Sequence, residues 1–256
     1  MKWIYGRQDW KTLERGLENC YLLTNGLGGF SSLTMTGAVA RNDHSIFMAC
    51  TKAPNHRINM IHRMKEELDI GESKYVFSTQ EFADGTKEEG YRYLIEFSFG
   101  ILPLWRYLTS GIEIEKEIAM AQGSNQIAVN YHLKNRGQKE GVLCVTPFFQ
   151  FEPKGEDLKE GKIFSRQEQK ITDGKYTLFF ETNGEAEEFQ EKKETYFYRY
   201  DECDGRRENG TASAVYQIKK RVKSGEETDL TVIYSLESQI DIEAKSLFDK
   251  MKEEQI

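Results

Sequence analysis

The chain has 256 residues, of which 38% are hydrophobic and 30% charged, and its formal net charge is −7 at pH 7. An acidic chain repels phosphate backbones, so we do not expect nucleic acid as a partner. No stretch approaches the roughly 18 apolar residues of a membrane-spanning helix, and the opening "MKWIYGRQDW" lacks the apolar core of a signal peptide, so we expect no membrane partner either.

Apolar and polar residues alternate with a period of two through most of the chain, which indicates strands with one buried and one solvated face. In "GIEIEKEIAM", for example, isoleucines alternate with glutamates. Short turns rich in Gly, Asn and Asp separate such segments. Strands are predicted, in chain order, at 45–51, 91–99, 112–120, 126–133, 141–149, 175–181, 194–200, 211–220 and 229–236. Many strands with short turns and no helices between them predict a mainly β chain, folded as one large antiparallel β-sandwich.

Three segments depart from the alternation. The polar stretch 151–162 predicts a surface loop, and the basic run "KKRVK" at 219–223 predicts a solvated strand edge. At the end of the chain the period changes, and one helical stripe collects five apolar residues: Ile240, Ala244, Leu247, Phe248 and Met251. We therefore expect a sandwich domain over residues 1–238 and a short C-terminal helix within residues 239–256.

Catalytic groups are scarce in this pattern. Glu113, Glu115 and Glu117 share one strand face with neighbouring Cα atoms about 7 Å apart, and paired carboxylates near that separation can hydrolyse glycosidic bonds. A solvated strand face, however, offers nothing that would perturb their pKa values. We therefore predict no catalytic residue in this chain.

Metal and cofactor motifs are also missing from the sequence. The histidines, at positions 44, 56, 62 and 132, lack H-E-x-x-H or Cys/His spacing, so neither a metal nor a cofactor is predicted. The cysteines, at positions 20, 50, 144 and 203, contain no C-x-x-C and are typical of reduced thiols in a cytoplasmic protein.

The stretch "LLTNGLGGFSS" at 22–32 carries three glycines in four positions, Gly26, Gly28 and Gly29. It lacks the phosphate-loop pattern, and no βαβ unit follows it. Glycines permit a positive φ or a close backbone approach, and Asn25 can hold its own turn through its side chain. Two interpretations stay open: a tight turn within a sheet, or a loop that lets a ligand or a neighbouring domain approach the main chain.

The same stretch carries a family resemblance. "YLLTNGLGGFSSLTMTG", the Arg41 and His44 of "ARNDHSIFMAC", and "KAPNHR" resemble the opening of the N-terminal domain of bacterial and archaeal glycogen debranching enzymes. "FSFGILPLWRY", "IEIEKEIAM", "SNQIAVNYHL" and the acidic "YFYRYDECDGRRENG" extend the likeness over roughly residues 18–236. The chain departs from the family pattern at Asp43 and at the three residues that follow His44.

The resemblance implies a supersandwich similar to that of galactose mutarotase and of the glucoamylase N-domain. In the family it precedes an (α/α)6 barrel, whose acidic residues hydrolyse α-1,6 linkages of glycogen-like glucans. This chain would then be the non-catalytic sandwich, with residues 239–256 as a linker toward the barrel. Its partners would be that catalytic domain, in cis or in trans, and an α-glucan.

The resemblance also implies which residues face the barrel or the glucan: Asn25, Gly26, Gly28, Gly29, Arg41 and His44, to which the sugar-stacking residue type adds Trp105. We expect the Asn25–Gly29 loop to present main-chain groups to the docking face. Arg41 and His44, on the next strand, are expected to lie close enough to brace this loop or to reach the same surface. We expect His44→Ala to leave stability nearly unchanged and to reduce docking or glucan binding.

Two alternatives remain. One is a stand-alone sugar-active enzyme of the aldose-epimerase type, in which His44 or His132 and a glutamate would act as acid and base. The other is a carbohydrate-binding or scaffold module without catalysis.

Overall fold

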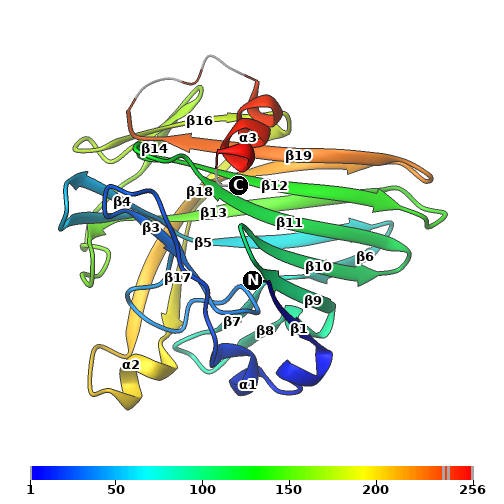
Figure 1. Cartoon of the computed structure of the whole chain (residues 1–256), viewed down its shortest axis with the longest axis horizontal. Coiled ribbons are helices and arrows are strands. Elements are labelled where there is room, and N and C mark those ends of the chain that lie inside the picture. Colours follow the sequence, from blue (N-terminus) through cyan, green and yellow to red (C-terminus); the bar gives the residue numbers. More distant parts are fainter. Residues whose placement is uncertain (1, 238–239, 241–242, 255–256) are drawn as a thin grey trace.

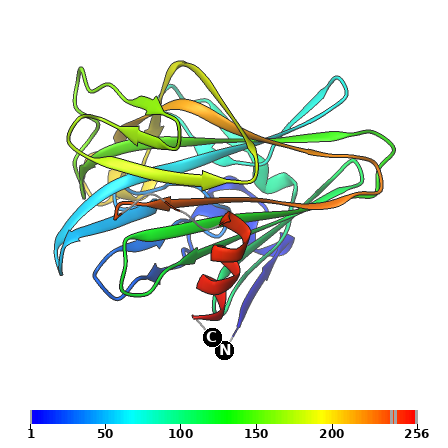
Figure 2. The same ribbon diagram turned by 90° about the horizontal axis from the view of Figure 1, so that it is seen from above.

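Two antiparallel β-sheets pack face to face in the computed structural model, which describes residues 2–237, 240 and 243–254 (Figures 1 and 2). The expected sandwich is confirmed. The boundary expected between residues 238 and 239 lies outside the described residues.

One sheet contains both the first and the last strand of the described chain. Its nine described strands have the spatial order β1 (Trp3–Gly6), β9 (Leu94–Phe99), β10 (Pro103–Thr109), β11 (Ile112–Met120), β12 (Gln126–Asn135), β19 (Glu227–Ser235), β16 (Thr177–Thr182), β15 (Lys170–Thr172) and β14 (Ser165–Gln167). The short strand β1 therefore forms one free edge of this sheet.

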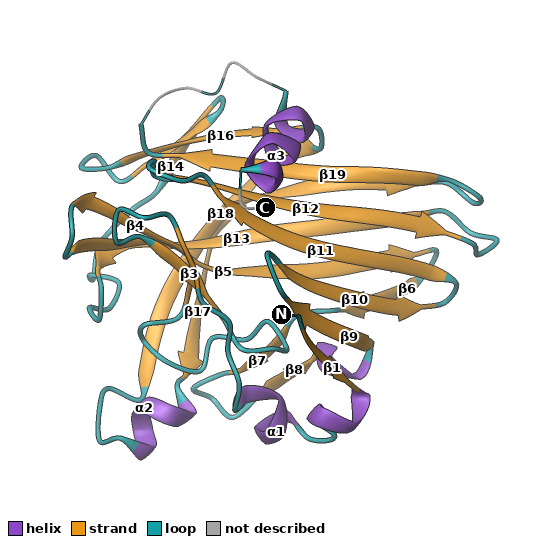
Figure 3. Ribbon diagram, in the orientation of Figure 1, coloured by secondary structure: helices purple, strands orange, loops and turns teal. Residues whose placement is uncertain are grey.

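The other sheet combines strands from both halves of the chain. Its described strands have the order β17 (Glu185–Phe197), β18 (Asn209–Val222), β13 (Gly141–Pro153), β5 (His56–Ile70), β4 (Ser45–Lys52), β3 (Phe30–Ser32) and β2 (Leu23–Thr24), with β6 (Ser73–Val76) paired to β5. A separate hairpin joins β7 (Thr79–Glu81) to β8 (Lys87–Glu89). The helical elements are η1 (Arg7–Trp10), α1 (Leu13–Leu17), η2 (Gly90–Arg92), α2 (Arg199–Cys203) and α3 (Ala244–Glu253) (Figure 3).

The alternation in the sequence sets the register of the central strands. Ile114 on β11 pairs with Leu133 on β12, Ile118 pairs with Val129, and all four side chains are buried. Cross-strand pairs of this kind are the unit that stabilises an antiparallel sheet. A shift by one residue would turn the isoleucines of β11 to the solvent and its glutamates to the core.

A buried ion pair connects the two sheets inside this core. The ammonium of Lys116 on β11 lies 2.5 Å from a carboxylate oxygen of Glu66 on β5. The hydroxyl of Tyr131 donates to the same oxygen over 2.9 Å. Removal of one charged partner would leave the other buried and unpaired, which is strongly unfavourable. The pair therefore helps to fix how the sheets are positioned on each other.

The C-terminal helix forms where its apolar stripe predicted it. Ala244, Phe248 and Met251 of α3 are buried against small side chains on the outer face of the nine-stranded sheet, and Ile240 joins the same cluster. Lys252 in its last turn lies 2.6 Å from Glu117 on β11. In Figure 2 the helix lies across the outside of this sheet. The stripe thus packs on the sandwich itself.

Other sequence expectations need correction. The "KKRVK" run is a strand edge only in part: Lys219 pairs with both β17 and β13, whereas Lys220, Arg221 and Val222 pair with β13 alone. Strand β13 extends to Pro153, so the start of the expected surface loop is strand. The strand expected at 194–200 ends at Phe197, and α2 begins at Arg199. Local composition reports neither a strand's neighbours in the sheet nor its end.

Among the described residues, no helix is both long and apolar enough to cross a membrane.

The packing of α3 generates a first prediction. Phe248→Ala removes the largest buried side chain of the helix, and such a truncation in a core costs about 3–5 kcal/mol when the site cannot collapse. Because α3 contacts the rest of the chain through one face, we expect local detachment. Amide hydrogen exchange in α3 should accelerate at least tenfold, while exchange in β11 and β12 stays slow.

The control is Lys250→Ala, which removes an exposed side chain from the same helix. If α3 exchanges equally fast in both variants, the helix does not depend on Phe248.

Candidate functional site

The glycine motif forms the tight loop that its composition predicted, between β2 and β3. The side-chain oxygen of Asn25 accepts hydrogen bonds from the backbone N–H groups of Leu27 and Gly29, both at 3.0 Å. Gly26 and Gly28 have φ values of 76° and 101°, which side chains with a Cβ disfavour. Asn25 is fully buried, so its amide has to be satisfied inside the protein.

The remaining bonds of this loop extend to both sheets. The side-chain nitrogen of Asn25 donates to the carbonyl of Ser124 over 2.9 Å. The backbone carbonyl of Asn25 accepts from the N–H of Gly123 over 2.8 Å. The Asn125 side chain bonds both backbone groups of Cys50 on β4, at 2.9 and 3.0 Å. We call this set, Asn25, Cys50, Gly123, Ser124 and Asn125, the asparagine clasp. It ties the β2–β3 loop and β4 to the β11–β12 turn.

Gly28 lies against the β4–β5 turn. A Cβ at Gly28 would lie 2.4 Å from the carbonyl oxygen of Pro54. The carbonyl of Gly28 accepts a bond of 2.6 Å from the guanidinium of Arg57. Several main-chain groups that were expected to face another domain are thus used within the sandwich, because backbones approach here more closely than a side chain would allow.

Arg41 belongs to a different part of the surface. It precedes β4, whereas the glycine loop lies near the other end of that strand. The guanidinium of Arg41 lies 2.8 Å from Asp204 and 3.6 Å from Asp201, and it covers the ring of Tyr200 at 5.3 Å. The expectation that Arg41 braces the glycine loop from the next strand is therefore wrong. It contacts the acidic segment at α2 instead, and that segment belongs to the same family resemblance.

His44 is an interior residue, with 5% of its surface exposed. Its Nδ1 accepts a hydrogen bond of 3.1 Å from the backbone N–H of Ala40. Burial, aided by the positive charge of Arg41, lowers the pKa of His44 to about 4. The ring is therefore neutral near pH 7 and holds the backbone before β4. It does not contact the glycine loop, so its expected bracing role is also wrong.

Trp105 is fully buried at 0% exposure. Its indole N–H donates to the carbonyl of Met35 over 3.0 Å, and Lys116 lies 5.2 Å from the ring centroid. Both its polar atom and its π-face are occupied within the protein. Since a sugar-stacking residue needs an accessible face, Trp105 does not serve as one.

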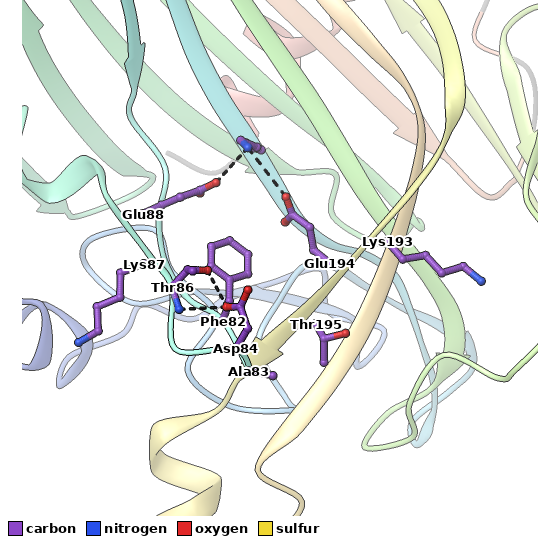
Figure 4. A pocket seen from close by; sticks show the side chains of 10 residues that line it. Phe82, Ala83, Asp84, Thr86, Lys87, Glu88, Lys193, Glu194 and Thr195 are labelled. Atoms are coloured by element: carbon purple, nitrogen blue, oxygen red, sulfur yellow. Dashed lines mark hydrogen bonds and ion pairs between the residues drawn. The ribbon is translucent and has the colours of Figure 1, made fainter.

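A charged hollow of about 760 Å³ lies between the β7–β8 hairpin and the edge strand β17. Its lining includes Phe82, Glu88, Glu194 and Lys65. Figure 4 shows Glu88 and Glu194 directed toward the same nitrogen atom between them, while Lys87 and Lys193 point outward. The ammonium of Lys65 lies 3.1 Å from Glu88 and 3.9 Å from Glu194. We call this feature the carboxylate hollow.

A buried arginine underlies the carboxylate hollow. Arg63 is 2% exposed and forms ion pairs with both carboxylates, at 3.2 Å in the case of Glu194. Its guanidinium also lies 5.4 Å from the Phe82 ring centroid and 5.5 Å from that of Tyr196. A buried guanidinium requires such compensation.

The two carboxylates titrate differently. Burial raises the pKa of Glu194, and the negative charge of Glu88 adds to that rise. Burial acts in the same direction on Glu88, but the charges of Arg63 and Lys65 outweigh it and lower the pKa of Glu88. Divergent pKa values are a property of acid and base pairs in enzymes, although ion-pair networks with a structural role produce them too.

Sequence reasoning missed the carboxylate hollow because its members come from three separate segments. One signal was present: Ile58, Met60, Ile61 and Met64 in "INMIHRMK" indicate a partly buried segment, and Arg63 stands among them. A charge in such a segment predicts a buried partner, but nothing local identifies Glu88 or Glu194.

The glutamates of β11 lie on the outer face of the nine-stranded sheet, as their alternation predicted. Glu115 pairs with Arg106 at 2.6 Å. Glu113, Glu115 and His132 line a shallow hollow of about 230 Å³. The side chain of His132 is 39% exposed and faces Asp229 at 3.3 Å. Nothing about these solvated groups favours an epimerase. No cluster able to hold a metal ion is found among the residues that the structure describes.

These observations define a large antiparallel β-sandwich domain with an asparagine clasp at its glycine motif. Comparison with protein families then assigns it. The family model "Glycogen debranching enzyme N terminal" matches residues 19–229, and the chain belongs to that family. No curated protein matches it. A solved structure described as "Putative kojibiose phosphorylase from human microbiome" is similar, with a TM-score of 0.48 and 9% identity. The similarity covers 99% of this chain and 35% of that one.

The glycine loop generates a second prediction. In Gly28→Ala a residue with a side chain has to adopt φ 101°, and the new Cβ also meets the Pro54 carbonyl. Gly85→Ala is the matched control, because its φ is +83° and nothing lies within 4 Å of a Cβ there. We expect Gly85→Ala to cost about 1–2 kcal/mol of unfolding free energy and Gly28→Ala at least about 1 kcal/mol more. Urea unfolding measures both, and equal losses would contradict the close approach.

The buried histidines generate a third prediction. The folded pKa of His44 is about 4 and that of His62 about 3, against 6.5 for an unperturbed histidine. Below pH 6.5 these histidines therefore bind more protons in the unfolded chain than in the folded chain. As the pH is lowered from 6.5 to about 3, their contribution makes the free energy of unfolding fall. For His44 the loss is on the order of 3 kcal/mol. Because His44 is buried and bonded to the backbone of Ala40, the expectation that His44→Ala leaves stability nearly unchanged no longer holds.

Urea unfolding at pH values from 7 to 4 measures this slope. His44→Gln cannot titrate, so its unfolding free energy should fall less steeply than that of the wild type between pH 6.5 and 4. Parallel slopes for the two proteins would show that His44 has the same pKa in the folded and the unfolded chain.

Proposed function

We propose that this chain is the non-catalytic N-terminal domain of a cytoplasmic debranching-type glycosidase, an amylo-α-1,6-glucosidase. The observation that carries the proposal is the family match over residues 19–229. In this proposal residues 1–238 pack against an (α/α)6 catalytic domain, in cis or in trans, and contribute to the binding of an α-glucan. Residues 239–256 are the helical link between the two domains.

Two regions named by the family resemblance remain available for docking. Gly26 is exposed at the tip of the glycine loop, and Arg41 is partly exposed beside α2. The clasp holds the loop rigidly, and a rigid loop loses little entropy when a partner covers it. His44 holds the backbone next to Arg41 from inside the sandwich.

The carboxylate hollow supports the non-catalytic assignment. Glycoside hydrolysis needs one carboxyl group as acid and a second as base or nucleophile, both directed at the sugar. Here Glu88 and Glu194 are directed at Lys65 and at Arg63, which is buried beneath them. Their charges stabilise these cations, which explains the network without a substrate.

The fourth prediction tests the proposal. The purified chain should release no glucose from a glycogen limit dextrin.

When an (α/α)6 catalytic domain of a debranching enzyme from this family is added as a separate polypeptide, the two should elute together in size-exclusion chromatography. In native gels, glycogen should retard the chain and a soluble cellulose derivative should not.

One result would overturn the non-catalytic assignment: glucose release by the chain alone that Glu194→Gln abolishes and Lys193→Ala preserves. Lys193 lines the same hollow but points away from it (Figure 4), so it is the matched control.

A further inference from the structure

A second, uncharged hollow lies beside the free edge of the nine-stranded sheet. Its volume is about 330 Å³, and it is lined by Trp3, Tyr5, Asn19, Cys20, Tyr21, Leu22, Phe97 and Phe99. We call it the aromatic hollow. One wall is β1 with its neighbour β9, and the other is the segment that leads into the glycine motif.

Strand geometry gathers the rings. Trp3 and Tyr5 are two residues apart on β1, so they project from the same face. They pair across the strands with Phe99 and Phe97, and the ring of Tyr5 stacks on Phe97 with centroids 6.1 Å apart. Trp3 remains 58% exposed. A large ring held on a strand and open to solvent is a platform on which another flat apolar surface can stack.

The chemistry of the lining selects a neutral ligand with hydroxyl groups. None of the eight lining residues is charged, whereas charged side chains line the carboxylate hollow and the hollow at His132. Within the described part of the chain, the hydroxyl of Tyr5 and the side-chain amide of Asn19 have no hydrogen-bond partner, so both are available to a ligand. Small-molecule sites typically combine an apolar lining with a few such polar groups.

We propose that the aromatic hollow binds a glucose unit of an α-glucan, with Trp3 stacked on the sugar ring and Tyr5 and Asn19 bonded to its hydroxyls. This inference rests on the proposed function, which supplies the class of sugar, and it adds the location of the site. It replaces Trp105 with Trp3 as the stacking tryptophan.

The chain provides its own reporter for this site. It contains three tryptophans, and Trp10 and Trp105 are only 2% and 0% exposed. Quenching of tryptophan fluorescence by acrylamide therefore reports mainly on Trp3. Maltoheptaose should reduce this quenching in a saturable manner, and cellohexaose at the same concentration should not.

Variants on one short strand separate the site from its surroundings. Trp3→Ala should weaken maltoheptaose binding in calorimetry about tenfold or more through loss of the stacking face. Tyr5→Phe keeps the ring and should weaken binding by about two- to tenfold through loss of one hydrogen bond. Ile4→Ala is the matched control, because Ile4 is 62% exposed on the opposite face of β1 and does not line the hollow. It should bind like the wild type.

Cysteine alkylation supplies an independent measurement. Cys20 lines the hollow, whereas Cys203 is exposed at α2, outside it. Maltoheptaose should slow alkylation of Cys20 and leave the rate at Cys203 unchanged, as measured by peptide mass spectrometry.

The outcomes distinguish this inference from the proposed function. Maltoheptaose binding that Trp3→Ala leaves intact would overturn the location and leave glucan binding by the domain standing. No binding of any α-glucan would overturn both the location and the glucan-binding part of the proposed function, but not docking of the catalytic domain. Protection of Trp3 that depends on the concentration of the chain itself, or on added catalytic domain but not on sugar, would identify the hollow as a protein interface and overturn the sugar site.

Discussion

The asparagine clasp is the constraint on which this end of the sandwich depends. Asn25 is buried, so each of its polar atoms needs a partner, and those partners lie in its own loop and in the turn between β11 and β12. Asn125 then passes the connection to β4 through both backbone groups of Cys50. This loop thereby joins the two sheets at one end, and Gly28 and Gly29 are required because Pro54 and Met48 approach its backbone too closely for a Cβ.

The fold could be predicted from the sequence because its determinants are local. Alternation between apolar and polar residues specifies strands and their buried faces, as at Ile114 and Ile118, and a helical stripe specifies α3. Asn25 with Gly28 specifies a tight loop. Neighbours in the sheet are not local: the sequence does not identify β17 and β13 as the strands that flank β18, nor Lys219 as the residue where pairing with β17 stops. The packing of α3 on the sandwich was likewise invisible, because a stripe does not identify the surface that covers it.

The candidate sites could be predicted only in part, for the same reason. Residue type suggested Arg41, His44 and Trp105, but burial decides what a side chain can do, and burial depends on contacts distant in sequence. His44 and Trp105 are enclosed by the fold. Arg41 contacts Asp204, which is 163 residues away. The sequence does not indicate a role for Trp3, because Trp3 stands near the N-terminus outside any motif. Its exposure follows from the position of β1 at a free edge of the sheet.

The two main hollows differ in how far their polar groups are already paired within the protein. In the carboxylate hollow, Arg63 and Lys65 use both carboxylates, so a neutral sugar would have to compete with ion pairs worth more than its hydrogen bonds. In the aromatic hollow the exposed ring of Trp3 and the hydroxyl of Tyr5 form no ion pair or hydrogen bond within the described chain, so a ligand would have to displace only water from them. The lowered pKa of Glu88 reflects the nearby charges of Arg63 and Lys65, whereas the exposed ring of Trp3 marks a surface that the described chain leaves unused.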